Sequence, residues 1–243
     1  MTPALRLREL TVCAPGERRL LDGVTLDVPA VGVHGLIGAN GAGKSTVLRA
    51  VLGVQAIRAG RIEIAGRALA DWPTAQLARH LGYMPQQTVC HWDLRVDEML
   101  RLRSPKLDPA LLECCRVRAL LERRFASLSG GEQARVVLAR TLAHAPRLVL
   151  ADEPAASLDL PQQHEMLALL RDVAAAGDCA VVVVLHDLHL AGRYCDRLSV
   201  LADGRLLADG EPAEVLREAV LRQAYKAPIQ ALNVAGRRHF TLP

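Results

Sequence analysis

The chain has 243 residues, of which 30 are basic and 26 acidic, for a net charge of +4. Hydrophobic residues make up 51%, which excludes an intrinsically disordered chain and predicts a packed core. Aromatic residues make up only 3% and no basic run concentrates the charge, so the composition does not indicate nucleic-acid binding.

Membrane and redox signals are weak. The first residues, MTPALRLREL, form no apolar signal core, and the most apolar stretch, 179–185, is far shorter than the ~20 residues that span a bilayer. The cysteines show no C-x-x-C spacing and are expected to be reduced thiols. If the chain acts at a membrane, we expect another subunit to do the spanning.

The first part of the chain is predicted to begin with strands and then to alternate strands with helices. The expected elements are strands Leu5–Val12, Leu20–Val28 and Val33–Ile37, a helix Ser45–Leu52, a hairpin of Arg61–Ile64 with Gly66–Leu69, and a helix Ala75–Leu81.

Between Gln87 and Leu128 the pattern changes to helical periodicity without strand-like runs. The expected helices are Asp97–Leu102, Pro109–Val117 and Arg118–Phe125. We interpret residues 87–128 as an inserted helical subdomain in a single domain whose core comprises 1–86 and 129–210.

From Gly130 the α/β pattern resumes. The expected elements are a helix from Gly130 to Ala143, a strand Arg147–Ala151, a helix Pro161–Ala176 and a strand Ala180–Leu185, followed in a C-terminal extension (211–243) by a helix Ala213–Ala224 and a strand-like end. Strands that alternate with helices predict an α/β fold with a mostly parallel sheet. The strands at the N-terminus predict an antiparallel β subdomain.

A Gly-rich segment between a predicted strand and a predicted helix fits the pattern G-x-x-x-x-G-K-[ST]. Its residues are Gly38, Ala39, Asn40, Gly41, Ala42, Gly43, Lys44 and Ser45, followed by Thr46. Glycines let backbone N–H groups point inward, and the helix N-terminus favours anions, so this segment predicts a phosphate loop. Lys44 would reach the β- and γ-phosphates, and the Ser45 hydroxyl would ligate Mg²⁺.

Two carboxylates follow the apolar strand at 147–151. Asp152 is placed to hold Mg²⁺, and Glu153 to act as a general base on water. A solvated acidic turn is the alternative, which the phosphate loop upstream disfavours.

The segment Leu128-Ser129-Gly130-Gly131-Glu132 precedes a helix. Ser129 with Glu132 three residues later is a capping box, which is one interpretation. A capped helix start with Gly130 and Gly131 can also cradle an anion, and both interpretations can hold together.

Together with Gln86 after Tyr83-Met84-Pro85, the Ser157-Leu158-Asp159 segment and His186 at a strand end, this order of motifs resembles the ATP-binding-cassette (ABC) ATPases over nearly the whole chain. The resemblance implies a P-loop NTPase core that hydrolyses ATP with Mg²⁺. It implies that Gln86 touches the Mg²⁺ and the attacking water, and that His186 contacts the γ-phosphate.

The same resemblance implies partners. Two copies of the chain would pack head to tail, so that each ATP lies between one phosphate loop and the Ser129-Gly130-Gly131 helix start of the other copy. Asp159 would link the two sites. Permease subunits in the membrane would bind this pair at the cytoplasmic face of the bacterial inner membrane, and a substrate-binding protein would act indirectly.

One feature of the family is missing. An aromatic residue that stacks on adenine usually lies upstream of the phosphate loop, but the segment from Leu10 to Leu20 has none. Ala14, Pro15 or the Arg18 guanidinium are the candidates for the base contact. We therefore predict that GTP competes unusually well with ATP.

The finer resemblance concerns the cargo. Segments 77–87, 157–164, 185–194 and 211–225 resemble ATPases of iron-siderophore, haem or vitamin B12 importers. The short helical stretch at 96–128, with MLRLRSP at 99–105, is closer to zinc and manganese importers, which remain the alternative. A non-transport ABC ATPase is a third reading, disfavoured by the single cassette and the short insertion.

Overall fold

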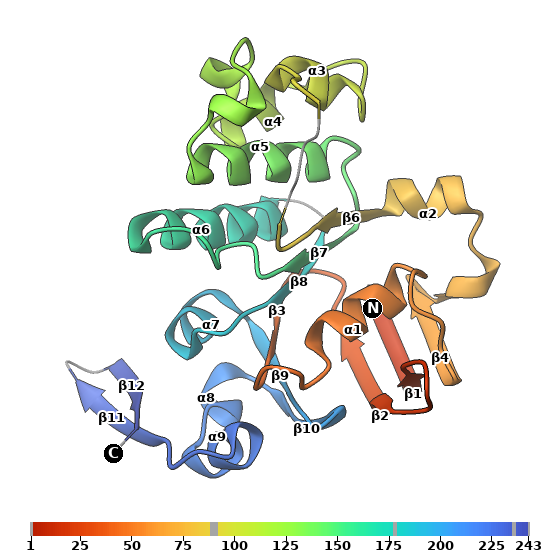
Figure 1. Ribbon diagram of the computed structural model, residues 1–243, viewed down its shortest axis with the longest axis vertical. Helices are drawn as coiled ribbons and strands as arrows, with labels where there is room; N and C mark the ends of the chain where they lie inside the picture. Colours follow the sequence, from red (N-terminus) through yellow and green to blue (C-terminus); the bar gives the residue numbers. More distant parts are fainter. Residues whose placement is uncertain (1, 88–91, 177–178, 235–236, 243) are drawn as a thin grey trace.

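The computed structural model describes residues 2–87, 92–176, 179–234 and 237–242 (Figure 1). Cys90 and part of the expected C-terminal strand pair lie outside the described residues. No helix within those ranges combines the length and the apolar character needed to cross a lipid bilayer.

The N-terminal part forms an antiparallel sheet, as expected. Its strands are β1 (Leu5–Cys13), β2 (Arg19–Val28), β4 (Ala59–Ile64) and β5 (Arg67–Ala68), in the order β2-β1-β4-β5. Leu5 and Leu7 face the core, and a register shift around Glu9, which has a φ of 48°, keeps Leu10 on the same buried face.

The central sheet is mostly parallel. Its strands are β3 (Gly32–Ile37), β6 (Leu81–Met84), β7 (Leu148–Asp152), β8 (Ala180–Val184), β9 (Arg197–Ala202) and β10 (Arg205–Gly210). The order is β10-β9-β3-β8-β7-β6, and only β10 runs antiparallel to its neighbour. The sequence patterns had not identified β6, β9 and β10 as strands.

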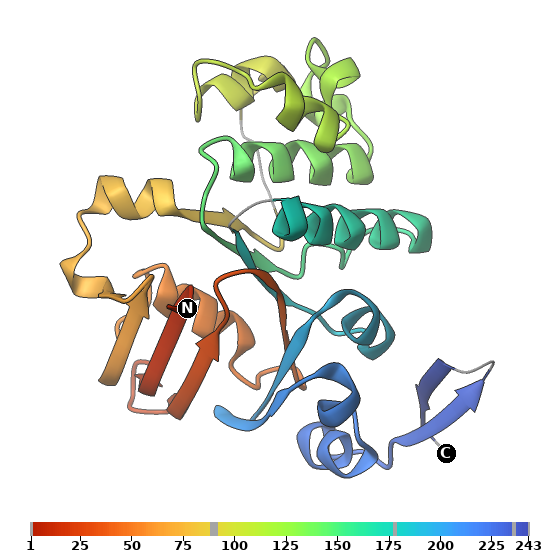
Figure 2. The same cartoon turned by 180° about the vertical axis from the view of Figure 1, so that it is seen from behind.

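Helices cover both faces of the central sheet. They are α1 (Lys44–Val51), α2 (Thr74–His80), α3 (Val96–Arg101), α4 (Pro109–Cys114), α5 (Gly130–Leu142), α6 (Leu160–Ala176), α7 (Leu188–Tyr194), α8 (Pro212–Val215) and α9 (Glu218–Tyr225). Figure 2 shows α3 and α4 stacked on α5, which lies in turn above α6. Gly53 follows α1 with a φ of 71°, as its helix-stopping role predicts.

The helix expected over Arg118–Phe125 is wrong. That segment holds two 3₁₀ turns, Arg118–Leu120 and Phe125–Ser127. Its backbone pairs with the segment before α3 instead: Val96 N–H donates to the Arg123 carbonyl, and Phe125 N–H donates to the Leu94 carbonyl. These bonds to a distant segment replace the i to i−4 bonds of a helix, and periodicity cannot reveal them.

The single helix expected over Ala213–Ala224 is also wrong. Leu216 and Arg217 leave the helical region, with ψ values of 55° and 144°, and separate α8 from α9. Leu216 is buried in the core, which explains why the chain turns there. The expected strand pair at the end is confirmed as the hairpin β11 (Gln230–Val234) and β12 (Arg237–Thr241).

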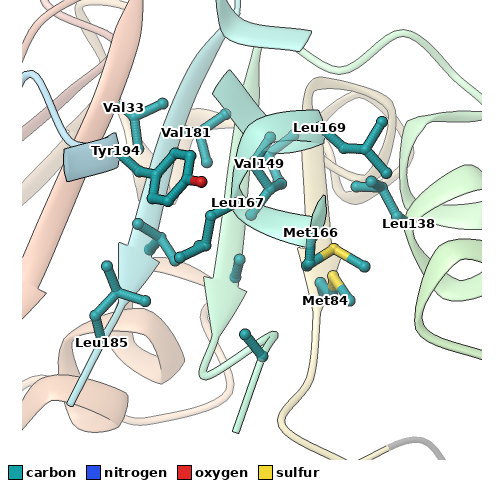
Figure 3. Packing of buried hydrophobic residues seen from close by; sticks show 14 of the residues in the cluster. Val33, Met84, Leu138, Val149, Met166, Leu167, Leu169, Val181, Leu185 and Tyr194 are labelled. Atoms are coloured by element: carbon teal, nitrogen blue, oxygen red, sulfur yellow. The ribbon is translucent and has the colours of Figure 1, made fainter. Parts of the chain in front are cut away.

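Two hydrophobic cores lie on opposite faces of the central sheet. Alternate residues of β8 divide between them: Val181 and Val183 face α6, whereas Val182 and Val184 face α1 and the first sheet. Figure 3 shows the first core, with Leu167 of α6 close to Val149. Because the central strands are buried on both faces, their sequences are continuous apolar runs.

Candidate active site

Four neighbouring strands end at the predicted functional segments. Strands β6, β7, β8 and β3 are adjacent and parallel, so their carboxyl ends lie along one edge of the sheet. Gln86 follows β6, Glu153 follows β7, His186 follows β8, and the phosphate loop follows β3. Open parallel sheets bind ligands at this edge.

The phosphate loop is a tight turn against β9. Gly38 has a φ of 144°, and a Cβ atom there would lie 2.1 Å from the Leu201 carbonyl oxygen, so only glycine fits. Gly43, with a φ of 104°, is the N-cap of α1. Asn40 and Gly41 are exposed at the tip, Ala39 and Thr46 are half-buried, and Ala42 is buried.

Lys44 is folded back onto this loop. Its Nζ donates to the carbonyl oxygens of Gly38 at 2.8 Å and of Ala39 at 3.0 Å. Burial lowers the pKa of the Lys44 ammonium, and the nearby Glu153 and Asp152 carboxylates oppose that effect. The Lys44 ammonium group, which the motif predicts to contact phosphates, therefore contacts these loop carbonyls in the structure.

Ser45 and Asp152 meet across the sheet edge. The Ser45 hydroxyl donates to Asp152 Oδ1 at 2.8 Å. Burial raises the pKa of Asp152, the Ser45 hydrogen bond lowers it, and Glu153 raises it further. A buried carboxylate beside a hydroxyl is a set of hard oxygen donors that suits Mg²⁺. The residues present thus fit the expected ion.

Glu153 lies between the other two predicted side chains. Gln86 Nε2 donates to Glu153 Oε2 at 2.6 Å, and His186 Nε2 lies 2.5 Å from Glu153 Oε1. Glu153 also has a φ of 51°, a left-handed conformation that costs on the order of 1 kcal/mol for a non-glycine residue. Residues in strained backbone conformations cluster at active sites, so this conformation supports a functional role for the Glu153 carboxylate.

The Ser129 segment is not joined to this cluster. Among the described residues, no hydrogen bond connects Ser129, Gly130 or Gly131 with the phosphate loop, and α5 and the β3–α1 loop lie in separate parts of the molecule (Figure 1). The capping box is confirmed: Glu132 N–H donates to Ser129 Oγ, and Ser129 N–H donates to the Glu132 carboxylate.

Asp159 lies near this helix start instead. Its Oδ1 accepts from the Gln162 backbone N–H at 2.9 Å, at the beginning of α6. A Cβ atom on Gly131 would lie 2.7 Å from the Gln162 side chain, so Gly131 is needed for the close approach of α5 and α6. Ser129, Gly130 and Asp159 are all exposed.

Sequence reasoning missed one element that shapes the site. The turn between β9 and β10 contacts the phosphate loop, because the Gly204 N–H donates to the Ala42 carbonyl at 3.1 Å. The Gly204 carbonyl accepts from the Asp22 N–H at 2.9 Å. The Asp203-Gly204 pair is a strong hairpin signal and could have revealed this turn.

The β1–β2 turn, where a base contact was expected, borders a cavity of about 570 Å³. Ala14 lines this cavity together with Cys13, Glu17, Arg19 and Arg58, among others. Pro15 and Arg18 are exposed and do not line it. No aromatic side chain is among the lining residues.

Residues 21–156 match the sequence profile described as ABC transporter. The chain is 41% identical to the Hemin import ATP-binding protein HmuV of Rhodococcus jostii (strain RHA1), over 90% of this chain and 78% of that protein. It is 40% identical to the protein of the same name from Bordetella pertussis (strain Tohama I / ATCC BAA-589 / NCTC 13251), over 98% of this chain and 96% of that protein.

Solved structures agree on the fold. A structure of an ATP-binding subunit of an ABC transporter matches with a TM-score of 0.78 and 30% identity, over 92% of this chain and 96% of that one. The structure of an inward-facing conformation of a putative metal-chelate type ABC transporter matches with a TM-score of 0.83 and 23% identity, over 99% of this chain and 98% of that one. The ordered motifs, their meeting point at one sheet edge and these similarities lead to one conclusion: the chain belongs to the ABC transporter family, as an ATP-binding subunit that hydrolyses ATP in support of transport.

Proposed function

We propose that the chain energises import of haem or a similar metal chelate, and that each of its side chains at the sheet edge has a distinct role in ATP hydrolysis. The observation that carries the enzymatic part is the convergence of Lys44, Ser45, Asp152 and Glu153 at one point. The cargo part rests on relatives named for hemin import at about 40% identity over most of the chain.

In this mechanism the phosphate loop, 38–46, binds the triphosphate through its backbone N–H groups. Lys44 leaves the Gly38 and Ala39 carbonyls and moves to the β- and γ-phosphates. Ser45 and Asp152 would hold Mg²⁺, which supplies neutralisation of phosphate charge. Gln86 would reach the ion and the water as well.

Glu153 acts as the general base on the attacking water. Its carboxylate oxygens are held in the free protein by Gln86 and His186, the two groups expected around the γ-phosphate. These contacts keep Glu153 at the site before nucleotide binds. His186 then turns toward the γ-phosphate, and positioning with charge stabilisation provides most of the rate.

One copy of the chain forms only half of this site. Ser129 and Gly130 are exposed at the start of α5, where a helix N-terminus favours an anion, yet this helix start lies apart from the chain's own phosphate loop. A second copy packed head to tail would bring its helix start to the nucleotide. Asp159, next to that helix start, would then contact the opposite site.

The permease partners need a docking surface. A cavity of about 420 Å³ lies beside Tyr83 and Pro85, just before Gln86. Leu77 and Val137 give it an apolar wall, while Arg103 and Arg140 give it positive charge. Burial and then Arg103 and Arg79 lower the pKa of His144 close by, which marks the wider surface as basic. We assign this groove to an apolar permease segment that carries a carboxylate.

The groove also explains the proposed division of the chain. Residues 87–128 would form the helical subdomain on one side of the groove, while β6 and α2 belong to the core (1–86 and 129–210) on the other. Gln86 at the junction would report permease movement to Glu153. In this proposal the chain works at the cytoplasmic face of the inner membrane, and a substrate-binding protein acts only through the permease.

A reconstituted transporter tests the proposal. The chain is combined with the permease and the binding protein from neighbouring genes in lipid vesicles, and ATP hydrolysis is measured with haem-loaded or zinc-loaded binding protein. Stimulation by haem and transport of haem into the vesicles are expected. Stimulation by zinc alone would refute the cargo assignment, and absence of any hydrolysis would refute the enzymatic mechanism.

A further inference from the structure

A cavity of about 650 Å³ lies between α6, α7, the α8 segment and the C-terminal strand β12. Figure 1 shows these helices and the hairpin at the end of the molecule opposite to α3 and α4. The residues that line the cavity include none from the phosphate loop, and neither Asp152 nor Glu153. Its volume lies in the range of about 300–1,000 Å³ that is typical of small-molecule sites.

The wall of this cavity is mostly apolar. The apolar residues include Leu160, Leu188, Leu190, Pro212, Leu216 and Phe240. The charged side chains on the wall are those of Asp187 and Arg193. Asp187 is already engaged, because its Oδ1 accepts from the backbone N–H groups of His189 at 2.7 Å and of Leu190 at 2.9 Å. Arg193 is exposed and adds positive charge to an otherwise apolar wall.

Two exposed imidazole rings lie side by side on the same wall. The rings of His189, on α7, and His239, on β12, have centroids 4.8 Å apart and are tilted by 49°. The Phe240 ring lies 5.8 Å from the His189 ring. Within the described part of the chain, neither imidazole makes a hydrogen bond or an ion pair, so no group there occupies their ring nitrogens.

These groups define a class of ligand. Imidazole binds iron, zinc and copper well, but a bare ion needs three or more protein ligands. The described residues contain no cluster of three His, Cys, Asp or Glu side chains that could hold one. A metal that already carries a planar ring of ligands needs only an axial ligand from the protein, and imidazole is the usual one for haem iron. An apolar wall suits the flat organic ring around such a metal.

His189 is the best placed of the three histidines on the wall to act as the axial ligand. Its backbone is fixed at the start of α7 by the Asp187 cap. His164 is engaged elsewhere, because its Nδ1 lies 2.9 Å from the Tyr194 hydroxyl. His239 lies in the C-terminal hairpin next to Phe240, where both rings can contact the face of a bound planar ligand.

We propose that this cavity binds a metal porphyrin, with His189 as an axial ligand to the metal and Arg193 near the carboxylate groups of the porphyrin. The site is separate from the nucleotide site. Its ligand belongs to the class proposed as cargo, but the inference rests on the residues of the cavity. A transport assay tests the cargo and the absorption spectrum of the isolated chain tests this site, so either can fail without the other.

Ferric haem is titrated into the full-length chain, and the Soret absorption band is recorded. We expect saturation at one haem per chain and the band shift of an imidazole–iron bond. His189→Ala should lose this shift and bind haem at least about tenfold more weakly, because the bond to the iron is gone. Thermal unfolding without haem should give the parental Tm, since the His189 side chain is exposed.

His144→Ala is the matched control. His144 is an exposed histidine that follows α5 and does not line the cavity. This variant should bind haem with the parental affinity and spectrum. Metal-free protoporphyrin is the second probe, and its binding should be weaker than that of haem and insensitive to the His189 substitution at the metal.

A parental spectrum and affinity in His189→Ala would overturn the axial role. Binding that does not saturate, or that weakens equally in His144→Ala, would show an adventitious additive only. Displacement of haem by ATP with Mg²⁺ would place the haem in the nucleotide site and overturn the proposal. A chain that binds haem through His189 but supports no haem transport would retain this site and refute the proposed cargo.

Discussion

At the scale of single residues, the charged groups of the site are paired with polar groups of the chain itself. Lys44 is held by loop carbonyls, Ser45 donates to Asp152, and Glu153 is contacted by both Gln86 and His186. Buried or half-buried charges need such partners. In the proposed mechanism, nucleotide and Mg²⁺ would take the place of these partners.

Replacing Glu153 with glutamine should separate binding from chemistry. The amide keeps the size of the side chain and cannot accept a proton from water, so we expect hydrolysis to fall by at least about 100-fold while ATP still binds. Hydrolysis and equilibrium binding are measured together. Glu165→Gln, which alters a carboxylate paired with Arg116 and Arg135, is the control and should hydrolyse ATP normally. Parental turnover in Glu153→Gln would exclude Glu153 as the base.

The missing aromatic residue leads to a prediction about the base. With Ala14 at the turn and no ring in the adjacent cavity, affinity comes from phosphate contacts that ATP and GTP share. We expect their dissociation constants to differ by less than about tenfold. Introducing a ring by Ala14→Tyr should tighten ATP binding about tenfold, because base stacking on an aromatic residue contributes ~1–3 kcal/mol. A strong preference of the parental chain for ATP in competition binding would contradict this view.

At the scale of elements, the N-termini of two helices are the expected binding points for phosphates. Helix α1 begins at the loop, with Gly43 as its N-cap, and α5 begins at Ser129 in a complete capping box. In the proposed mechanism the first would bind the chain's own nucleotide, and the second would contact the nucleotide of a partner copy. The two glycines that follow Ser129 differ in their surroundings: Gly131 allows the close approach of α6, whereas a Cβ atom on Gly130 would only reach van der Waals distance of Leu158, at 4.0 Å.

Ser129→Arg tests the partner role of α5. The long cation should prevent a second copy from closing on ATP, while binding of ATP to the isolated chain stays unchanged. Dimerisation with ATP is measured by light scattering in the Glu153→Gln background, which slows hydrolysis. Ser129→Thr keeps the capping oxygen and should still dimerise. Equal loss of ATP binding and dimerisation in Ser129→Arg would argue against a contact in trans.

A buried polar network joins β3, β9 and β10. The Ser199 hydroxyl donates to Asp209 at 2.6 Å, so His34 Nε2, which is 2.7 Å from Ser199 Oγ, must be the donor in that pair. Arg197 also pairs with Asp209. Burial lowers the pKa of His34 to about 4, Asp209 opposes that effect, and Arg197 supports it. The neutral imidazole is therefore the native form.

This network predicts a pH dependence of stability. The unfolded chain binds a proton on His34 below about pH 6.5, whereas the folded chain does so only near pH 4, so stability is lost as pH falls through this window. Between pH 7 and pH 5 the free energy of unfolding should drop by about 2 kcal/mol more in the parental chain than in His34→Gln. Urea unfolding at both pH values measures it, and equal losses would show that His34 does not titrate as inferred.

At the scale of the whole molecule, the proposal assigns three surfaces to ligands and partners. The sheet edge would receive the nucleotide, the exposed Ser129 and Asp159 region would face a second copy, and the groove beside Tyr83 and Pro85 would face the permease. Gln86 adjoins the groove and contacts Glu153 directly. If the permease docks in this groove as proposed, its movement would change the position of Glu153, the proposed general base.

Charge reversal in the groove tests permease docking. In Arg103→Glu combined with Arg140→Glu, we expect recovery of the chain with permease-containing membranes to fall at least tenfold, while ATP hydrolysis by the isolated chain is retained. Arg61→Glu, on the first sheet beside Glu63, is the control. Parental recovery of the double variant with the membranes would place the permease contact elsewhere.

The parts of the protein that depend on local chemistry could be predicted from short sequence patterns. The phosphate loop, the carboxylates at 152–153 and the capping box at Ser129 are short patterns whose glycines, charges and hydrogen bonds act within a few residues. The strands flanking them were also predictable, because strands buried on both faces form continuous apolar runs.

Other features depend on contacts between segments that are distant in the sequence. Strand β6 has four residues and no distinguishing pattern, and it exists because β7 provides its hydrogen bonds. The 3₁₀ turns after α4 replace a helix because their backbone pairs with the segment before α3. The hydrogen bond from the Gly204 N–H to the Ala42 carbonyl joins residues more than 160 positions apart. Such contacts arise from packing between distant segments, and no local pattern encodes them.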